Sequence, residues 1–226
     1  MIEFTPYRNV ENIINNSAYK ISIDTLRSLV YKRTLFDYLT KRGLKVKNIK
    51  SHSKISANVK KLLWTKKTTG VKQIITPYFK NIIVTTPYYL NRESNYRKFS
   101  LIAFGLSQYN KPLHAEAKKE LLQMFSKFDV TSYDLSIDLS HPLDTSILSN
   151  FGEITSKYST IYINKPYGFN NIAKICYYDK GRKDNLHYQL YRLELTIKTK
   201  GKLQDMFLPD GEIHQIIEKI SDKVEM

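Results

Sequence analysis

Hydrophobic and polar residues alternate with a period of two in many short segments of this chain, which is typical of half-buried β-strands. The pattern predicts strands at 19–24, extending toward Val30, and at 73–78, 81–86, 98–105, 131–139, 160–164, 172–180 and 191–198. A period near 3.6 predicts helices at 34–42, 113–128, 144–156 and 209–224, and a short helix is predicted at 59–64.

Strands and helices follow one another in a similar order in the two halves of the chain. This order favours an α+β fold, with a largely antiparallel sheet covered by helices on one face and open on the other. We expect residues 1–226 to form a single domain, with an N-terminal half at 1–128 and a C-terminal half, 129–226, that carries the chemistry.

The charge of the chain indicates a polyanionic partner, first of all nucleic acid. The chain has 36 Lys and Arg against 21 Asp and Glu, a net charge of +15. Segment 38–92 contains thirteen Lys and Arg and no acid. An AT-rich gene enriches lysine but does not remove acids, so we predict DNA contacts in this segment, although a solvated surface is the alternative. The candidate contacts are Lys60, Lys61, Lys66 and Lys67, and the interleaved aromatic residues are candidates for stacking on bases.

Several classes of protein are excluded by what the sequence contains. A single cysteine, Cys176, rules out a disulfide scaffold and a multi-cysteine zinc site. The five histidines lack metal-binding spacings, and no phosphate-binding glycine motif is present. The N-terminus does not read as a signal peptide, and no apolar run is long enough for a membrane span, so we expect a cytoplasmic protein with no membrane partner.

Acidic residues on two predicted strands suggest a metal site. In strand 131–139 the alternation places Asp134 and Asp138 on the face opposite the apolar residues, and strand 191–198 places Glu194 likewise. Carboxylates on one face repel each other unless a cation lies between them. If the strands are neighbours, these three acids predict an all-oxygen Mg²⁺ or Mn²⁺ site. A solvated outer face is the alternative.

Strand 172–180 carries two adjacent tyrosines, and its parity distinguishes them. Tyr178 shares the polar face with Lys174 and Lys180, whereas Tyr177 shares the apolar face with Ile175 and is expected in the core. Ammonium groups beside a phenol favour the phenolate and also hold phosphate, so Tyr178 and Lys180 are predicted catalytic residues. A β-bulge would reverse the assignment of the two tyrosines.

A family resemblance rests on the run YDKGRKDN at 178–185 and the following strand YRLELTIK at 191–198. Together with FG at 104–105 and SYDLSID at 132–138, this order resembles the rolling-circle replication initiators of the staphylococcal plasmid type and the related relaxases of integrative elements. The sequence departs from the family pattern at Tyr133, where Arg is usual, and at Thr196, where a second acid often follows. Filamentous-phage replication endonucleases have a comparable strand pattern, so the type of mobile element stays open.

The resemblance implies an endonuclease that nicks one strand of origin DNA and starts rolling-circle replication or transfer. Tyr178 would attack the phosphodiester and keep the 5′ phosphate, and the metal on the three acids would position that phosphate. Further predicted DNA contacts are Lys174, Arg182, Lys183 and Arg192. A host helicase and a second copy of the chain are further candidate partners, and whether Asp24 joins the metal site stays open. The alternatives are a DNA-binding protein without catalysis and a metal-dependent nuclease that uses water.

Overall fold

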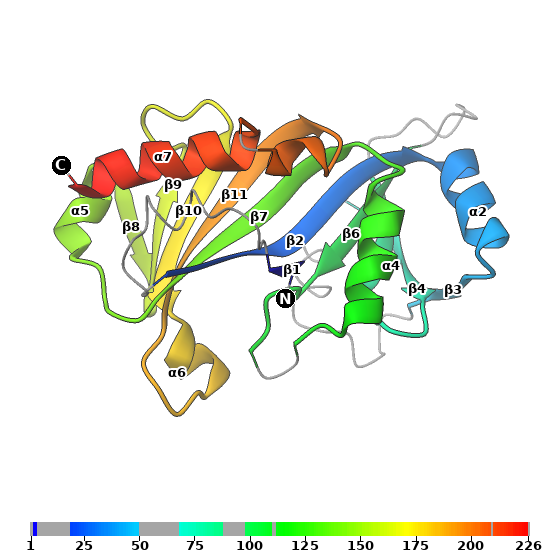
Figure 1. Ribbon diagram of the computed structural model, residues 1–226, viewed down its shortest axis with the longest axis horizontal. Helices are drawn as coiled ribbons and strands as arrows, with labels where there is room; N and C mark the ends of the chain where they lie inside the picture. Colours follow the sequence, from blue (N-terminus) through cyan, green and yellow to red (C-terminus); the bar gives the residue numbers. More distant parts are fainter. Residues whose placement is uncertain are drawn as a thin grey trace.

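One sheet of eleven strands, in which every pairing is antiparallel, organises the computed structural model (Figure 1). The structure describes residues 2–3, 19–49, 68–87, 98–109, 112–208 and 210–225. Ten strands follow the order β3-β4-β5-β6-β2-β7-β11-β10-β9-β8, and the short strand β1 (Ile2–Glu3) pairs with β2. The predicted α+β class with a largely antiparallel sheet is therefore confirmed.

The two halves of the chain repeat one pattern of strand, helix, four strands and helix. The first half comprises β2 (Tyr19–Tyr31), α2 (Lys32–Lys41), β3 (Lys45–Asn48), β4 (Thr68–Ile75), β5 (Ile82–Pro87), β6 (Lys98–Phe104) and α4 (Ala115–Phe125). The second half comprises β7 (Val130–Leu139), α5 (Thr145–Ser149), β8 (Ile154–Lys157), β9 (Thr160–Asn164), β10 (Ile172–Asp179), β11 (Tyr191–Gly201) and α7 (Glu212–Glu225), with two additions, α6 (Lys180–Asp184) and η1 (Asp205–Phe207). The first strands of the halves, β2 and β7, pair at the centre of the sheet.

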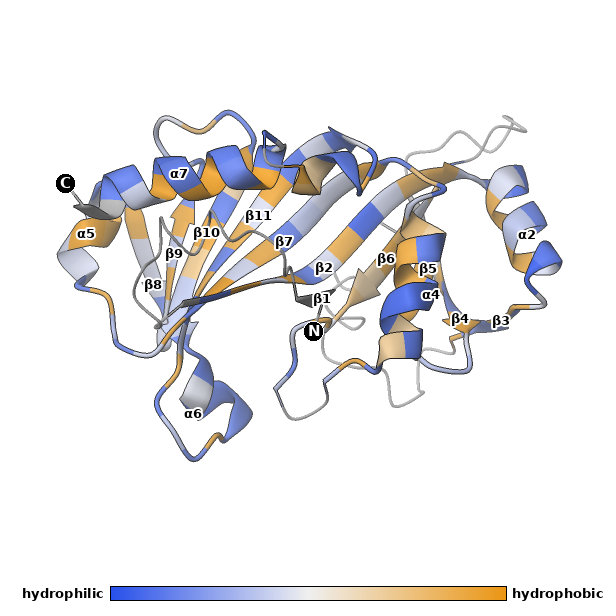
Figure 2. Cartoon of the chain, in the orientation of Figure 1, coloured by the Kyte–Doolittle hydropathy of each residue, from blue (hydrophilic) through white to orange (hydrophobic). Residues whose placement is uncertain are grey.

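Helices α4 and α7 cover one face of this sheet, as the sequence predicted. Figure 1 shows α4 and α7 lying across the same side of the strands. Leu121 and Phe125 from α4, and Ile216 from α7, are buried in one cluster with strand residues such as Leu135 and Leu195. Hydrophobic and hydrophilic bands alternate along both helices and along the strands (Figure 2), so each element buries one side. This single apolar cluster runs through both halves of the chain.

The centre of the opposite face is a buried polar layer. Ser22, Ser136 and Asp138 have at most 2% of their surface exposed, although all three point away from the helices. On β4, β5 and β6 the same face carries a small apolar cluster under the partly buried Ile49, which contains Val71, Ile83, Ile102 and Phe104. The face therefore holds a buried polar layer in one half and an apolar layer in the other.

Two predicted elements end earlier in the structure than the sequence indicated. The helix predicted at 144–156 is only α5, since Gly152 takes a φ of 143° and the chain then forms the edge strand β8. Strand β10 ends at Asp179, whose side chain caps α6 by accepting a hydrogen bond from the Arg182 N–H at 2.7 Å. Lys180 therefore begins a helix. The helix predicted at 59–64 lies outside the described residues. None of the helices in the described ranges is long and apolar enough to cross a membrane.

Candidate active site

A β-bulge in β2 brings Asp24 to the polar face of the sheet. The register with β7 shifts between Ile23 and Thr25, so Asp24 is an extra residue without a Cα partner on β7. Gly105 turns the chain after β6 with a φ of 68°, and the Leu106 N–H then donates to the Asp24 carbonyl oxygen at 2.9 Å. This turn brings the Ser107 hydroxyl to Asp24 Oδ1 at 2.6 Å.

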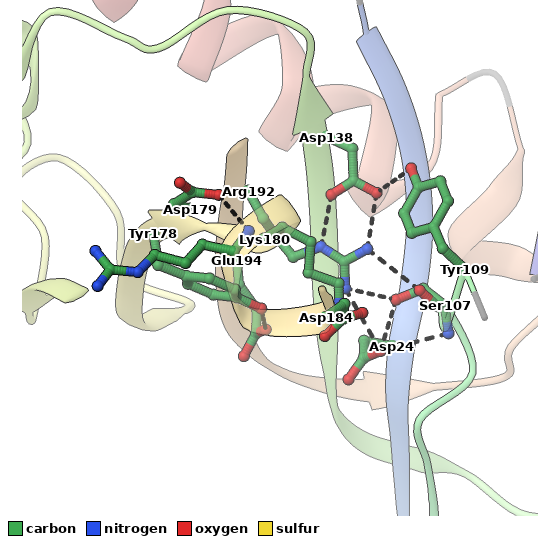
Figure 3. A network of polar contacts seen from close by, with 11 residues as sticks. Asp24, Ser107, Tyr109, Asp138, Tyr178, Asp179, Lys180, Asp184, Arg192 and Glu194 are labelled. Atoms are coloured by element: carbon green, nitrogen blue, oxygen red, sulfur yellow. Dashed lines mark hydrogen bonds and ion pairs between the residues drawn. The ribbon is translucent and has the colours of Figure 1, made fainter. Parts of the chain in front are cut away.

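The guanidinium of Arg192 lies at the centre of this layer and has no exposed surface (Figure 3). Its Nε and Nη2 donate to the two carboxylate oxygens of Asp138, the latter at 2.7 Å. Its Nη1 donates to Ser107 Oγ at 2.8 Å and lies 3.6 Å from Asp24 Oδ1. The Tyr109 hydroxyl donates to Asp138 Oδ2 at 2.7 Å. Arg192 thus links β11 to β7, to β2 and to the turn after β6.

This position corrects the prediction that Arg192 contacts DNA. A side chain without exposed surface, whose guanidinium is held by Asp138, Ser107 and Asp24, has no donor facing a phosphate. The planar fork of arginine suits two-point binding of a carboxylate, and the additional hydrogen bonds compensate for the loss of water around both charges. We therefore assign Arg192 to the framework of the site.

Asp134 forms a second arginine-carboxylate pair on the same face. Arg27 of β2 donates to its two oxygens at 3.1 and 2.7 Å. Arg27 is about one third exposed and Asp134 is buried. This pair spans the central β2-β7 pairing, four residues along β7 from Asp138.

Tyr178 lies beside Glu194 on the neighbouring strand, and its hydroxyl donates to Glu194 Oε2 at 3.0 Å. Tyr178 is 6% exposed and points to the polar face (Figure 3). Tyr177 belongs to the apolar core, where its hydroxyl accepts a hydrogen bond from the Leu143 N–H at 2.8 Å and its ring stacks on Tyr191. The predicted parity of the two tyrosines is confirmed.

Burial and like charges perturb the proton affinities of this pair. Burial raises the pKa of the Tyr178 phenol, and the negative charge of Glu194 raises it further, so the phenol is protonated at neutral pH. Burial also raises the pKa of Glu194, with the neighbouring carboxylates Asp24 and Asp134 adding to the effect. Glu194 is therefore a stronger proton acceptor than an ordinary glutamate, and it lies in contact with the one proton that Tyr178 can give.

The predicted cations occupy different positions around Tyr178. Lys183 places its Nζ 4.1 Å from the centroid of the Tyr178 ring. Lys180, which was predicted to flank the phenol, is 5% exposed and pairs with Asp184 at 2.9 Å. Lys174 lies further along β10, with its Nζ 5.6 Å from the Tyr162 ring. Lys183, and not Lys180, is thus the ammonium group next to Tyr178.

A groove of about 590 Å³ opens beside Tyr178. It is lined by Tyr178, Asp179, Arg182 and Lys183 on one side and by the β8-β9 turn with Tyr158 on the other. Arg182 and Lys183 are exposed, so their charges are available to a ligand in the groove. Lys60, Lys61, Lys66 and Lys67 lie outside the described residues.

The predicted metal ligands are on one face but have separate partners. Asp138 is occupied by Arg192 and Tyr109, Asp134 by Arg27, and Glu194 by Tyr178. In the part of the chain that the structure describes, no three His, Cys, Asp or Glu side chains are arranged to hold a metal ion. This holds for the predicted set of Asp134, Asp138 and Glu194 and equally for Asp24, Asp134 and Glu194. The charges of Asp24 and Asp134 raise the pKa of Glu194, and a nearby cation would relieve that repulsion.

Sequence reasoning missed four residues of this site or left them open. Asp24 and Arg27 lie on the predicted first strand. Arg27 is three residues from the apolar Val30, and in a strand this odd spacing could have indicated a cation on the polar face. Ser107 and Tyr109 lie in the turn after Gly105, and nothing in the local sequence marks them.

No family model matches this chain, and no curated protein sequence matches it. Among solved structures, it is similar to the structure of the rolling circle replication initiator protein from Geobacillus stearothermophilus. The two share 12% sequence identity with a TM-score of 0.42, over 91% of this chain and 80% of the other. This similarity identifies no functional residue of the chain.

We predict that Arg192→Met lowers the free energy of unfolding by about 3–5 kcal/mol, because it leaves Asp138 buried without its cation. Urea denaturation measures the change. Arg182→Met is the matched control, since Arg182 is exposed, and it should alter stability little. A stable Arg192→Met protein with weakened DNA binding would instead support the original assignment of Arg192 as a DNA contact.

We predict that Glu194→Gln stabilises the fold at pH 7. A carboxyl whose pKa is raised in the folded state binds its proton more tightly there than in the unfolded chain, so its favourable contribution exists at low pH. That contribution is lost as the pH rises above the ordinary value of 4.5 through the raised value. Glutamine keeps an oxygen for Tyr178 but carries no charge.

Unfolding free energies measured in urea between pH 4 and 8 test this prediction. The difference between Glu194→Gln and the unmodified chain should grow as the pH rises and vanish near pH 4. Glu153→Gln, at an exposed position, should show little difference at any pH. A loss of stability in Glu194→Gln at neutral pH would show that Glu194 is a favourable charge in this layer.

Proposed function

We propose that this chain is an endonuclease that nicks and rejoins one DNA strand, using Tyr178 as the nucleophile. The observation that supports it best is the hydrogen bond of 3.0 Å from the Tyr178 hydroxyl to Glu194, on a tyrosine that also lines a groove with Arg182 and Lys183. A nucleophile, a proton acceptor and phosphate-binding cations are the groups that strand transfer requires.

In this proposal Glu194 acts as the general base. The raised pKa of the phenol means that Tyr178 attacks only if its proton leaves during the reaction, and Glu194 Oε2 already accepts that hydrogen bond. The Tyr178 oxygen forms a bond to phosphorus while the bond from phosphorus to the 3′ oxygen breaks. The proton passes to Glu194, and the departing 3′ oxygen takes a proton from water to become a free 3′ hydroxyl. The reverse sequence rejoins the strand.

Lys183 and Arg182 supply positive charge in the groove. The Lys183 ammonium lies 4.1 Å from the Tyr178 ring centroid, close enough to bind the phosphate that Tyr178 attacks and to stabilise its added negative charge. Lys180 is paired with Asp184, so in this mechanism it positions α6 instead of touching the substrate.

A divalent cation, Mg²⁺ or Mn²⁺, is part of the proposal. Glu194, Asp134 and Asp24 are not arranged for a metal ion in this structure, so they would have to move closer together to hold it, whereas Asp138 stays with Arg192. When bound, such a cation polarises a phosphate oxygen and stabilises the charge that develops on it. The binding requires Asp134 to share or release Arg27.

The family resemblance of the sequence supports a role for this nicking activity in starting replication or transfer of a plasmid, phage or integrative element. A free 3′ hydroxyl is what a polymerase extends, and a covalently held 5′ end can be rejoined after one round. Origin DNA is then the substrate and a host helicase the next partner in the process.

We predict that Tyr178→Phe abolishes the covalent protein–DNA adduct, because phenylalanine has no oxygen to attack phosphorus. The measurement is an incubation with Mg²⁺ or Mn²⁺ and a supercoiled plasmid that carries the chain's own gene and flanking DNA, followed by denaturing electrophoresis. Tyr177→Phe, one residue away in the core, should retain adduct formation. Peptide mapping should place the 5′ phosphate on Tyr178, and its discovery on Tyr177 or on another tyrosine would contradict the mechanism.

We predict that chelation stops nicking, and that Asp134→Asn and Asp24→Asn each raise the Mn²⁺ concentration needed for it at least several-fold. Direct Mn²⁺ binding, followed by electron paramagnetic resonance, should weaken in parallel. Asp138→Asn is the matched control, since it should lower stability without changing Mn²⁺ affinity. Unaltered Mn²⁺ binding in Asp24→Asn and Asp134→Asn would place the cation elsewhere, and nicking in excess chelator would exclude it from the reaction.

A further inference from the structure

The turn between β8 and β9 presents a tyrosine that the fold itself does not use. Tyr158 is 95% exposed, whereas most other aromatic side chains of the described residues pack into the core or into contacts between elements. Its backbone has a φ of 57°, a left-handed conformation that suits glycine or asparagine and costs a tyrosine about 1–2 kcal/mol. A strained, fully exposed ring is unfavourable for folding, which points to a role in binding.

The surroundings of Tyr158 indicate the chemistry of the ligand. Tyr158 lines the same groove as Arg182, Lys183 and Tyr178. Lys157 places its Nζ 5.7 Å from the Tyr158 ring centroid, so a further cation lies beside the ring. The neighbouring residues of β8 are all exposed and mostly polar, so the turn offers no apolar patch for a protein partner. An aromatic ring next to cations is the combination that binds single-stranded nucleic acid.

The register of the sheet places Tyr158 near the proposed nucleophile. Thr160 is the direct cross-strand partner of Tyr178, and Tyr158 lies in the turn two residues before Thr160. A base on Tyr158 would therefore belong to a nucleotide one or two positions from the phosphate at Tyr178. The groove volume of about 590 Å³ is sufficient for such a nucleotide.

We propose that Tyr158 is a base-stacking platform that binds an unpaired nucleotide of single-stranded DNA next to the scissile phosphate, with Arg182 and Lys183 holding the adjoining phosphates. The choice of DNA rests on the proposed function. A duplex cannot use this subsite, because its bases are already stacked on each other. The subsite would therefore select DNA that is already melted or extruded as a hairpin.

The test compares two ligands of equal length and charge: an oligothymidylate, and a chain of the same length built from abasic sugar phosphates. Fluorescence anisotropy gives both affinities, in a Tyr178→Phe background so that no strand is cleaved. Tyr158→Ala should weaken oligothymidylate binding about 5- to 100-fold, the range for the loss of one stacked base, and leave abasic binding unchanged. Tyr158→Trp, which keeps a stacking surface, should retain the preference for thymidylate.

Two controls separate stacking from effects on folding. Tyr167→Ala removes another exposed tyrosine, from a turn that does not line the groove, and should change neither affinity. Tyr158→Asn relieves the left-handed strain, so it should lose the preference for thymidylate while its free energy of unfolding stays equal or rises. Equal effects of Tyr158→Ala on both ligands, or no effect on either, would overturn the proposal.

The outcomes for the subsite and for the enzyme can be told apart. If the unmodified chain forms the covalent adduct but Tyr158→Ala keeps the preference for bases, the subsite is refuted and the proposed function stands. If the preference depends on Tyr158 but no adduct forms on any substrate, the subsite stands in a protein that binds single strands without cleaving them.

Discussion

The buried pair of Arg192 and Asp138 is the interaction on which the geometry of the site depends. Moving both charges out of water costs several kcal/mol, which this structure offsets by giving the guanidinium partners on three elements and giving Asp138 the Tyr109 hydroxyl. Because Arg192 and Asp138 are direct cross-strand partners joined by two hydrogen bonds, their pair favours this register of β11 against β7. Glu194, two residues along β11, is thereby held beside Tyr178. A slip of one residue would turn Glu194 into the core.

The acids on this face have different roles because arginine neutralises only some of them. Asp138 and Asp134 each have a guanidinium partner, which compensates for their burial. Glu194 has a phenol instead, and burial together with the charges of Asp24 and Asp134 raises its pKa. The two arginine pairs, Arg192 with Asp138 and Arg27 with Asp134, therefore leave Glu194 as the carboxylate with a raised pKa. That carboxylate is the one in contact with the proposed nucleophile, where a proton acceptor is needed.

The alternation of polar and apolar residues predicted which side chains of each strand point to the polar face, because the period of two in a strand depends only on neighbouring residues. It placed Tyr178 and Glu194 together and Tyr177 in the core, as the structure does. Pairing partners could not be predicted, since they depend on contacts between distant segments. The bulge at Asp24 and the turn after Gly105 bring acid and hydroxyl groups to Arg192. The Asp179 cap starts α6 at Lys180, the residue predicted to end the strand, and Lys180 pairs with Asp184.

The two halves of the chain share one backbone arrangement, but among the described residues only the second half carries the strands with Tyr178 and Glu194. Strands β5 and β6 occupy the places in the first half that β10 and β11 occupy in the second. On the face away from the helices, the first pair carries Ile83, Ile102 and Phe104, and the second carries Tyr178 and Glu194. The same backbone arrangement thus supports an apolar layer in one half and a charged layer in the other. The pairing of β2 with β7 joins the apolar layer of the first half to the charged layer of the second half. The apolar layer therefore supports side chains whose burial as charges opposes folding.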